Sequence, residues 1–217
     1  MKTQFATAAA ILALAMSGGF VNPAHAAGGS YVVLWNQNAN FGNGVNSQTY
    51  QSSKSAYDDV AADDFIVPNG ETWRISEVDV TGAYVGRHQG PASSVQISIY
   101  AGPKWHPKRI LKSYTVSCTD NDGSFQCVLP TKKRGNPALK LNSGHYWLSV
   151  VANCRSKICG QWKWTENTSV TDYEGVWENP ANGWKTACLG WDLIRGCFGG
   201  NPVDLAFDLI GTSTPSK

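Results

Sequence analysis

The sequence predicts an all-β fold: a two-sheet antiparallel sandwich of the jelly-roll kind, held by three local disulfides. Short segments with apolar residues at alternate positions recur along the chain, and Gly, Pro and Asn separate them. Outside the first residues, no window of a dozen residues has a helical period. The six cysteines form three close pairs in the second half of the chain. We expect roughly nine to eleven short strands.

The first cysteine pair predicts its own hairpin. Asp122-Gly123 lies midway between Cys118 and Cys127, and Asp-Gly is a strong signal for a two-residue turn because both positions tolerate positive φ. Counting outward from the turn places the two cysteines opposite each other at a non-hydrogen-bonded site. Their Cα atoms would be roughly 4.5 Å apart there, which is within disulfide range.

The other two pairs, Cys154/Cys159 and Cys188/Cys197, have no second ligand pair with zinc-site spacing close by. Six cysteines allow about 15 connectivities in principle. The short separations favour three sequential disulfides, whose role would be to hold the loops of the C-terminal half.

The N-terminus has the features of an export signal. Lys2 precedes an apolar stretch at residues 5–16, and Ala24-His25-Ala26 fits the small-x-small cleavage rule. We therefore expect a signal peptide at residues 1–26 and a single β-sandwich domain at residues 27–217. The polar end of the chain contains no apolar anchor, so the expected location is secreted or periplasmic.

The predicted strands follow in chain order. Residues 31–35 form a first candidate strand, whereas residues 36–55 have almost no apolar periodicity and are expected to be a long loop or an irregular edge. The phase of the apolar residues changes near Ser76 and Glu77, which predicts a bulge. Further strands are indicated by three alternating series: Val95, Ile97 and Ile99; Tyr146, Leu148 and Val150; and Val203, Leu205, Phe207 and Leu209.

Three segments together resemble a group of secreted bacterial β-sandwich modules. They are residues 61–84, which begin Ala-Ala-Asp-Asp-Phe-Ile-Val-Pro, the strand at residues 95–100 and the closing residues 204–211. These modules share an "ADDF, V-P, G, W, I, V" signature and are often joined to surface-anchoring tails. The resemblance covers most of the expected domain. It implies the sandwich fold and an extracellular location, and it implies no particular activity.

The net charge of the chain is close to balanced. The whole chain has a formal charge of +2, which falls to about +1 without the signal peptide. This balance does not favour nucleic acid or an anionic membrane as the partner. The local basic run at residues 132–134 is interpreted as a solvated loop. The sequence leaves the oligomeric state open.

Aromatic residues gather near the C-terminus, where five tryptophans lie within thirty residues: Trp162, Trp164, Trp177, Trp184 and Trp191. They could fill the core or form a binding surface on loops. Tryptophan rings stack on the C–H faces of sugars, and amides and carboxylates bind their hydroxyl groups. We expect Trp184 and Trp191 to be exposed, and an extracellular or envelope polysaccharide to bind a site made of Trp177, Glu178, Asn179, Asn182, Trp184, Trp191 and Asp192.

Acidic residues form a second cluster, because Asp58, Asp59, Asp63 and Asp64 lie within seven residues. Like charges this close need solvent, hydrogen bonds or a cation. Calcium prefers such oxygen ligands, and a site of Asp63 or Asp64 with Asp204 or Asp208 would suit it. The alternative is a solvated turn, and no other cofactor is expected.

Sequence motifs of common enzymes are absent, and His88, His106 and His145 are isolated in the sequence. A glycosidase needs only two carboxylates that the fold brings together, and Glu166, Glu174 and Glu178 lie near the tryptophans. Three hypotheses follow: a non-catalytic recognition module, a structural or interaction protein of the cell envelope, and a hydrolase. We take the recognition module as the prediction.

Overall fold

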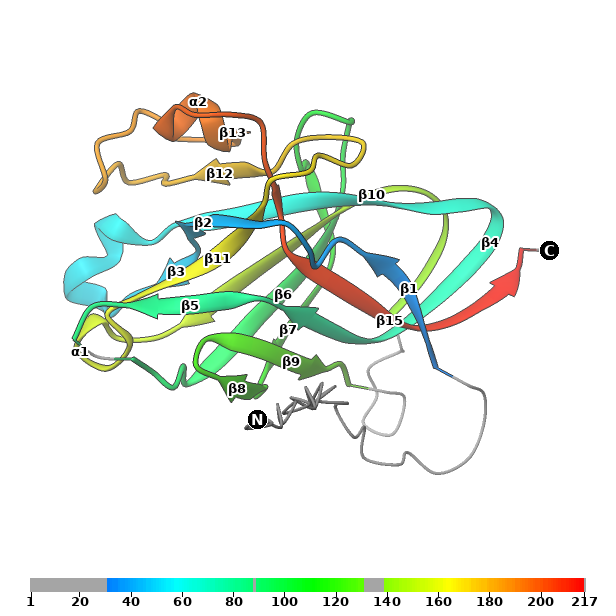
Figure 1. The fold of residues 1–217 in the computed structure, drawn as a ribbon, viewed down its shortest axis with the longest axis horizontal. Helices are drawn as coiled ribbons and strands as arrows, with labels where there is room; N and C mark the ends of the chain where they lie inside the picture. The colour runs from blue at the N-terminus through cyan, green and yellow to red at the C-terminus, as the bar shows by residue number, and fades with distance from the viewer. Residues whose placement is uncertain (1–30, 88, 131–138, 217) are drawn as a thin grey trace, which may run out of the picture.

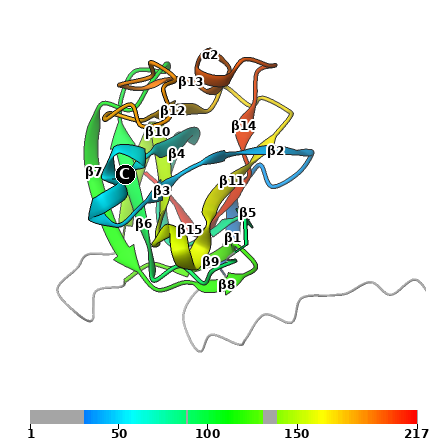
Figure 2. The same cartoon turned by 90° about the vertical axis from the view of Figure 1, so that its left-hand side faces the viewer.

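The structure is a computed structural model that describes residues 31–87, 89–130 and 139–216. Antiparallel strands form two layers that pack face to face, which confirms the predicted fold class (Figures 1 and 2). The expected signal peptide at residues 1–26 and the basic run at residues 132–134 lie outside the described residues.

The larger sheet has six strands along its main path: β1 (Val32–Asn36), β15 (Phe207–Pro215), β4 (Val60–Val80), β10 (Leu139–Asn153), β6 (Ser94–Ala101) and β7 (Arg109–Val116). Shorter strands extend it: β3 (Gln48–Thr49), β8 (Thr119–Asn121), β9 (Ser124–Val128), β12 (Val176–Glu178) and β13 (Asp192–Leu193). The smaller sheet contains β14 (Asp204–Leu205), β11 (Gln161–Asn167), β2 (Phe41–Asn46) and β5 (Gly82–Val85). The helices are short: η1 (Ser52–Tyr57), α1 (Ser156–Cys159) and α2 (Ile194–Phe198).

The described residues contain fifteen strands, more than the nine to eleven expected. Several have only two or three residues, and pairing with a distant strand defines them rather than any local pattern. The segment at residues 36–55 contains an irregular edge strand of the smaller sheet, which is one of the two alternatives expected for it. Its Phe-Gly-Asn-Gly-Val-Asn segment forms β2 because β11 pairs with it, and β3 and η1 follow.

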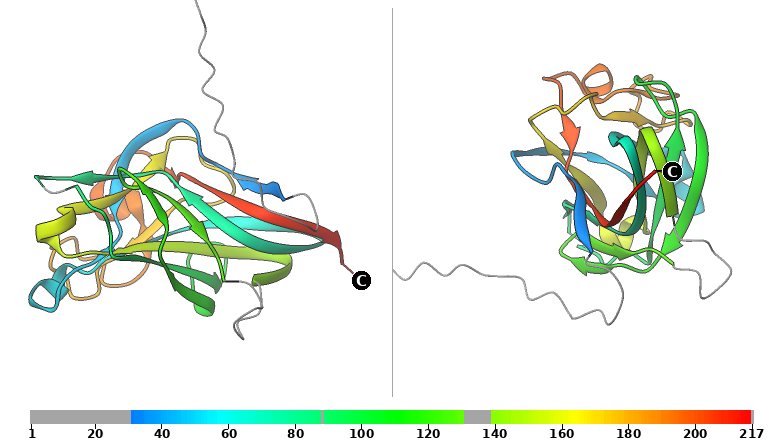
Figure 3. Two further views of the ribbon diagram at one scale, coloured as in Figure 1. Left: turned by 90° about the horizontal axis from the view of Figure 1, so that it is seen from below. Right: turned by 90° about the vertical axis from the view of Figure 1, so that its right-hand side faces the viewer.

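The longest strand, β4, joins the halves of the larger sheet. Its first part pairs with β12 and β10, and its second part pairs with β15 and β9. Ile210 lies opposite Glu77 while Gly211 lies opposite Ile75, so Ser76 is an extra residue. This is the predicted bulge. Figure 3 shows that β15 and the C-terminus reach the end of the sandwich opposite η1 and α1.

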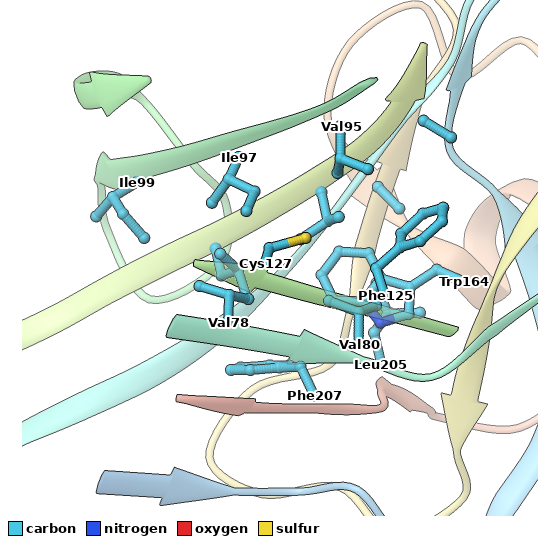
Figure 4. Packing of buried hydrophobic residues seen from close by; sticks show 14 of the residues in the cluster. Val78, Val80, Val95, Ile97, Ile99, Phe125, Cys127, Trp164, Leu205 and Phe207 are labelled. Atoms are coloured by element: carbon cyan, nitrogen blue, oxygen red, sulfur yellow. The ribbon is translucent and has the colours of Figure 1, made fainter. Parts of the chain in front are cut away.

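The core lies between the two sheets. Val95, Ile97 and Ile99 on β6 are buried as predicted and contribute to the same cluster as Trp164 and Phe207 (Figure 4). On β10 the prediction of one buried face was incomplete. Trp147 is fully buried on the opposite face from Leu148, because β12 and its connections cover that side.

All three predicted disulfides are present, with Cα–Cα distances of 4.5, 6.0 and 5.8 Å in chain order. The first closes the expected hairpin, in which Asp122 and Gly123 adopt φ values of 53° and 98°. The third joins the loop after β12 to α2. It therefore holds together the group formed by β12, β13 and α2 along one side of the sandwich (Figure 1).

Candidate functional site

Three of the five clustered tryptophans belong to the interior. Trp162, Trp164 and Trp177 have no exposed surface. The Nε1 group of Trp177 donates a hydrogen bond to the Asn46 carbonyl at 2.8 Å, so its polar atom is satisfied inside the protein. The prediction that Trp177 contacts a ligand was wrong, since packing between the layers takes up its whole surface.

Asn179 was also wrongly predicted as a binding residue. It is fully buried, and its Nδ2 group donates to the carbonyl oxygens of Ala56 and Asp58 at 2.9 and 2.7 Å. Its Oδ1 atom accepts a hydrogen bond from the backbone N–H of Trp184 at 3.1 Å. Asn179 therefore connects the loop after β12 to the end of η1.

Trp184 and Trp191 are half-buried rather than exposed as expected, because each packs against other aromatic rings. Trp184 packs on Tyr50 and Tyr57, whereas Trp191 meets Tyr100 of β6 edge-on at 6.0 Å.

The remaining predicted polar contacts are Glu178, which is half-buried, and Asn182 and Asp192, which are exposed. Asn182 and Asp192 accept hydrogen bonds from nearby backbone N–H groups through their Oδ1 atoms. Glu178 and Trp191 both lie beside Tyr100, whereas Trp184 lies against Tyr50 and Tyr57.

A groove of about 800 Å³ lies on the outer side of the smaller sheet, next to the predicted segment. The strands β2 and β11 form its floor, and α2 with the connection to β14 forms a wall. The polar and aromatic residues that line it are Asn43, Asn46, Lys163, Glu166, Thr168, Phe198 and Asn201.

Glycines of β2 line the floor of the groove. A Cβ atom at position 44 would lie 3.0 Å from the Cβ of Lys163 and 3.0 Å from the Trp164 carbonyl oxygen, so a side chain at this position would crowd the neighbouring strand β11. Gly42 also faces the groove. Glycine inside a strand often marks a place where a ligand or another backbone comes close.

Phe198 is the aromatic residue of the groove. The residue is 52% exposed, and its ring meets the buried Trp177 ring at a centroid distance of 4.8 Å and an interplanar angle of 63°. Gly199 and Gly200 follow with φ values of 75° and 99°, which turn the chain from α2 toward β14. Trp177 therefore supports the exposed ring from inside.

The groove carries one charge of each sign. Burial raises the pKa of Glu166, and the nearby Lys163 ammonium lowers it in part. The sequence signal for this site is the pair of glycines in β2, within the segment expected to be a long loop or an irregular edge. Phe198 and Asn201 could not be linked to that strand before the fold was known.

The predicted acidic site is partly assembled. On one edge of β4, pairing with β12 ends at Ala62 and pairing with β15 begins at Glu71. Asp63 and Asp64 lie just after β12 ends, and Asp204 of β14 approaches them. All three are completely buried, and burial together with their mutual charge raises the pKa of Asp63 and of Asp204.

Asp63 is well satisfied by hydrogen bonds. It accepts from Gln37 Nε2 at 2.7 Å, from the backbone N–H of Asp64 at 2.9 Å and from the backbone N–H of Leu205. Asp204 differs, since only its Oδ2 atom has a donor, the backbone N–H of Thr171 at 2.6 Å. The buried Oδ1 atom of Asp204 has no partner.

The prediction that Asp208 could share this site is not supported. Its carboxylate accepts hydrogen bonds from the side-chain amides of Asn36 and Asn38 at 2.7 and 3.2 Å, and it lies opposite Asp79. The Asp58 and Asp59 carboxylates are also engaged elsewhere, with the backbone N–H groups of Tyr50 and Gln48. The four acids that are close in sequence therefore separate into two environments.

Two residues that sequence reasoning did not select join the acidic cluster. His145 Nε2 lies 2.6 Å from Asp64 Oδ2 and 3.7 Å from Asp172 Oδ2. His145 belongs to β10, which pairs with β4, so strand register brings it beside Asp64. No local motif could indicate this contact, because about eighty residues separate the two in sequence.

No protein-family model matches the chain, and no curated protein matches it. One solved structure is similar, that of the cysteine protease and lectin-like domains of Cwp84, a surface layer associated protein of Clostridium difficile. The match has a TM-score of 0.43 and 12% identity, and it covers 73% of this chain but only 32% of that one.

Proposed function

We propose that this protein is an exported, non-catalytic recognition protein that binds a glycan or another extracellular surface in the groove beside α2. The observation that carries the proposal is the groove itself, which has a glycine floor and an exposed aromatic ring. Its volume lies in the range of ordinary ligand sites. The groove lies next to the C-terminal segment that the sequence indicated.

The chemistry of the groove suits a hydroxylated ligand. Phe198 offers an apolar ring face held in place by Trp177, and the exposed amides of Asn43 and Asn201 can donate to and accept from hydroxyl groups. Lys163 and Glu166 balance each other in charge, which disfavours a strongly charged polymer. A neutral saccharide chain fits this combination.

The same lining supports binding rather than hydrolysis. Glu166 is the only carboxylate among the described residues of the groove, whereas most glycosidases use a pair. Glu174 and Glu178 lie elsewhere. Glu174 accepts a hydrogen bond from Arg195 Nε at 2.6 Å, and Glu178 lies near Tyr100.

The export part of the proposal rests on the signal peptide expected from the sequence and on the three disulfides. Disulfides persist in oxidising compartments, so the fold fits a secreted or periplasmic location. Within the described ranges, no helix has the length and apolar character needed to cross a membrane.

One observation favours the second candidate, an interaction protein of the envelope. The edge strand β1 exposes Val32 and Val33 at 48% and 57%. Exposed apolar edge strands can pair with another chain. A protein that uses β1 in this way would need no glycan.

The test is binding to insoluble peptidoglycan, chitin and cellulose in pull-down assays, with wild-type protein and the Phe198→Ala variant. We expect binding to at least one polymer, and at least a tenfold loss in Phe198→Ala. Trp105→Ala is the matched control because Trp105, at 59% exposed, is an aromatic residue outside the groove. No binding to any polymer, or equal binding by Phe198→Ala, would contradict the proposal.

A further inference from the structure

We propose that Asp64, His145 and Asp172 bind a divalent transition-metal ion of the zinc class. This site is separate from the groove beside α2 and does not depend on glycan binding. It uses three residues that β4, β10 and the loop after β11 bring to one place.

The geometry provides three ligand atoms that converge. One oxygen from each carboxylate and one nitrogen of the imidazole lie within 4.8 Å of one another. The Asp64 side chain is completely buried, whereas those of His145 and Asp172 are 15% and 23% exposed. The cluster therefore has a closed inner side and an opening through which an ion could enter.

A second observation indicates a missing positive charge. Asp204 is completely buried, and its Oδ1 atom has no hydrogen-bond partner. Its other oxygen accepts from the backbone N–H of Thr171, directly before Asp172, and its charge acts on Asp64 and Asp172. An unpaired buried carboxylate is costly, and a cation next to it would offset that cost.

The chemical types of the three protein ligands indicate which ion would bind. Calcium takes oxygen ligands, and the sequence alone suggested calcium because only carboxylates were visible there. Imidazole together with carboxylates suits zinc and related ions. Three protein ligands with an open side would leave at least one coordination position for water or another molecule.

Two existing contacts compete with the ion. Asp64 already forms a short contact with His145, and Lys104 Nζ lies 3.9 Å from Asp172 Oδ1. Glu174, the other nearby acid, is engaged by Arg195. Removing the ammonium of Lys104 should therefore strengthen metal binding, because the ion would no longer compete with it for Asp172. Of the two competing residues, Lys104 is the one that lies mostly in solvent.

The experiment is calorimetric titration of metal-free, tag-free protein with zinc chloride, and separately with calcium chloride, alongside thermal unfolding. We expect one zinc ion per chain, a higher melting temperature with zinc, and weaker binding of calcium. His145→Gln and Asp172→Asn should each weaken zinc binding at least tenfold, whereas Lys104→Met should strengthen it. His106→Gln and Asp208→Asn are the controls, a histidine and an acid outside the cluster.

Absence of stoichiometric zinc binding to the wild-type protein would overturn the proposal. So would tighter binding of calcium than of zinc, or zinc affinity that remains the same in a folded Asp172→Asn variant. Equal loss in His106→Gln would show that zinc binds at another place. The Lys104→Met variant keeps the test decisive if a cluster variant does not fold, because unchanged or weaker zinc affinity in that variant contradicts the proposed competition.

Discussion

Trp184 Nε1 donates a hydrogen bond to the carbonyl oxygen of Tyr57 at 2.9 Å, and the two rings meet edge-on with centroids 5.2 Å apart. This pair joins the loop after β12 to the end of η1. The buried Asn179 connects the same two segments through its amide. Trp184 therefore acts as a packing residue that holds a long connection in place.

We predict that Trp184→Ala destabilises the protein by about 2 kcal/mol, less than for a fully buried tryptophan, because part of the ring is in solvent. Trp184→Phe should lose less, since it keeps an aromatic ring against Tyr57. Urea unfolding followed by circular dichroism measures both. Trp105→Ala serves as the control for an exposed tryptophan and should change the free energy of unfolding by less than about 0.5 kcal/mol. An equally stable Trp184→Ala would show that the contact contributes nothing.

A second prediction concerns pH. Burial raises the pKa of Asp59 to about 8, well above the value in an unfolded chain. The folded state therefore binds a proton that the unfolded state has released, and stability should fall as pH rises from about 4 to about 8. One such group contributes a slope of up to about 1.4 kcal/mol per pH unit.

Asp59→Asn should remove this part of the pH dependence and unfold at a higher temperature than the wild type at pH 9. Thermal unfolding between pH 5 and pH 9 tests it. The exposed Asp192 provides the control variant, Asp192→Asn, whose pH profile should follow that of the wild type. Parallel profiles of Asp59→Asn and the wild type would mean that Asp59 is ionised in the folded protein.

A third prediction concerns Asp63, which accepts hydrogen bonds from Gln37, Asp64 and Leu205. Asp63→Ala leaves buried donors without an acceptor and should cost about 3 kcal/mol or more. Asp208→Ala should lower the free energy of unfolding by less. Asp208 lies nearer the surface, and its partners are two side-chain amides. Chemical denaturation of both variants measures the difference, and equal losses would contradict the structural role of Asp63.

These residues show which parts of the protein the sequence could predict. The Cys118–Cys127 hairpin follows from contacts between residues close in the chain, and turn chemistry alone determines its register. The alternation on β6 predicts its buried face because one face meets the core. The bulge at Ser76 follows from a change of phase within one strand.

The parts that could not be predicted depend on contacts between distant residues. The burial of Trp177 and Asn179 is determined by Asn46 and by η1, which lie more than a hundred residues away. The strand β2 has no apolar alternation and forms because β11 pairs with it. His145 approaches Asp64 through the register of β10 against β4. A single sequence gives no signal for such pairs.

The last prediction connects the disulfides to the groove. Cys118–Cys127 and Cys188–Cys197 each close a loop with a sequence separation of 9, so the chain-entropy model gives about 2 to 3 kcal/mol for either one. Only the second holds α2, which carries Phe198 into the groove. Breaking it should therefore leave the exposed ring less well positioned and should increase the entropy lost on binding.

We predict that Cys188→Ser/Cys197→Ser and Cys118→Ser/Cys127→Ser lose similar stability, whereas only the first variant loses polysaccharide affinity, by about tenfold. Denaturation midpoints and pull-down assays on the same preparations separate the two effects. Equal affinity losses in both variants would show that general loosening of the fold weakens binding. Full affinity in a folded Cys188→Ser/Cys197→Ser variant would show that α2 does not need its disulfide to form the wall of the groove.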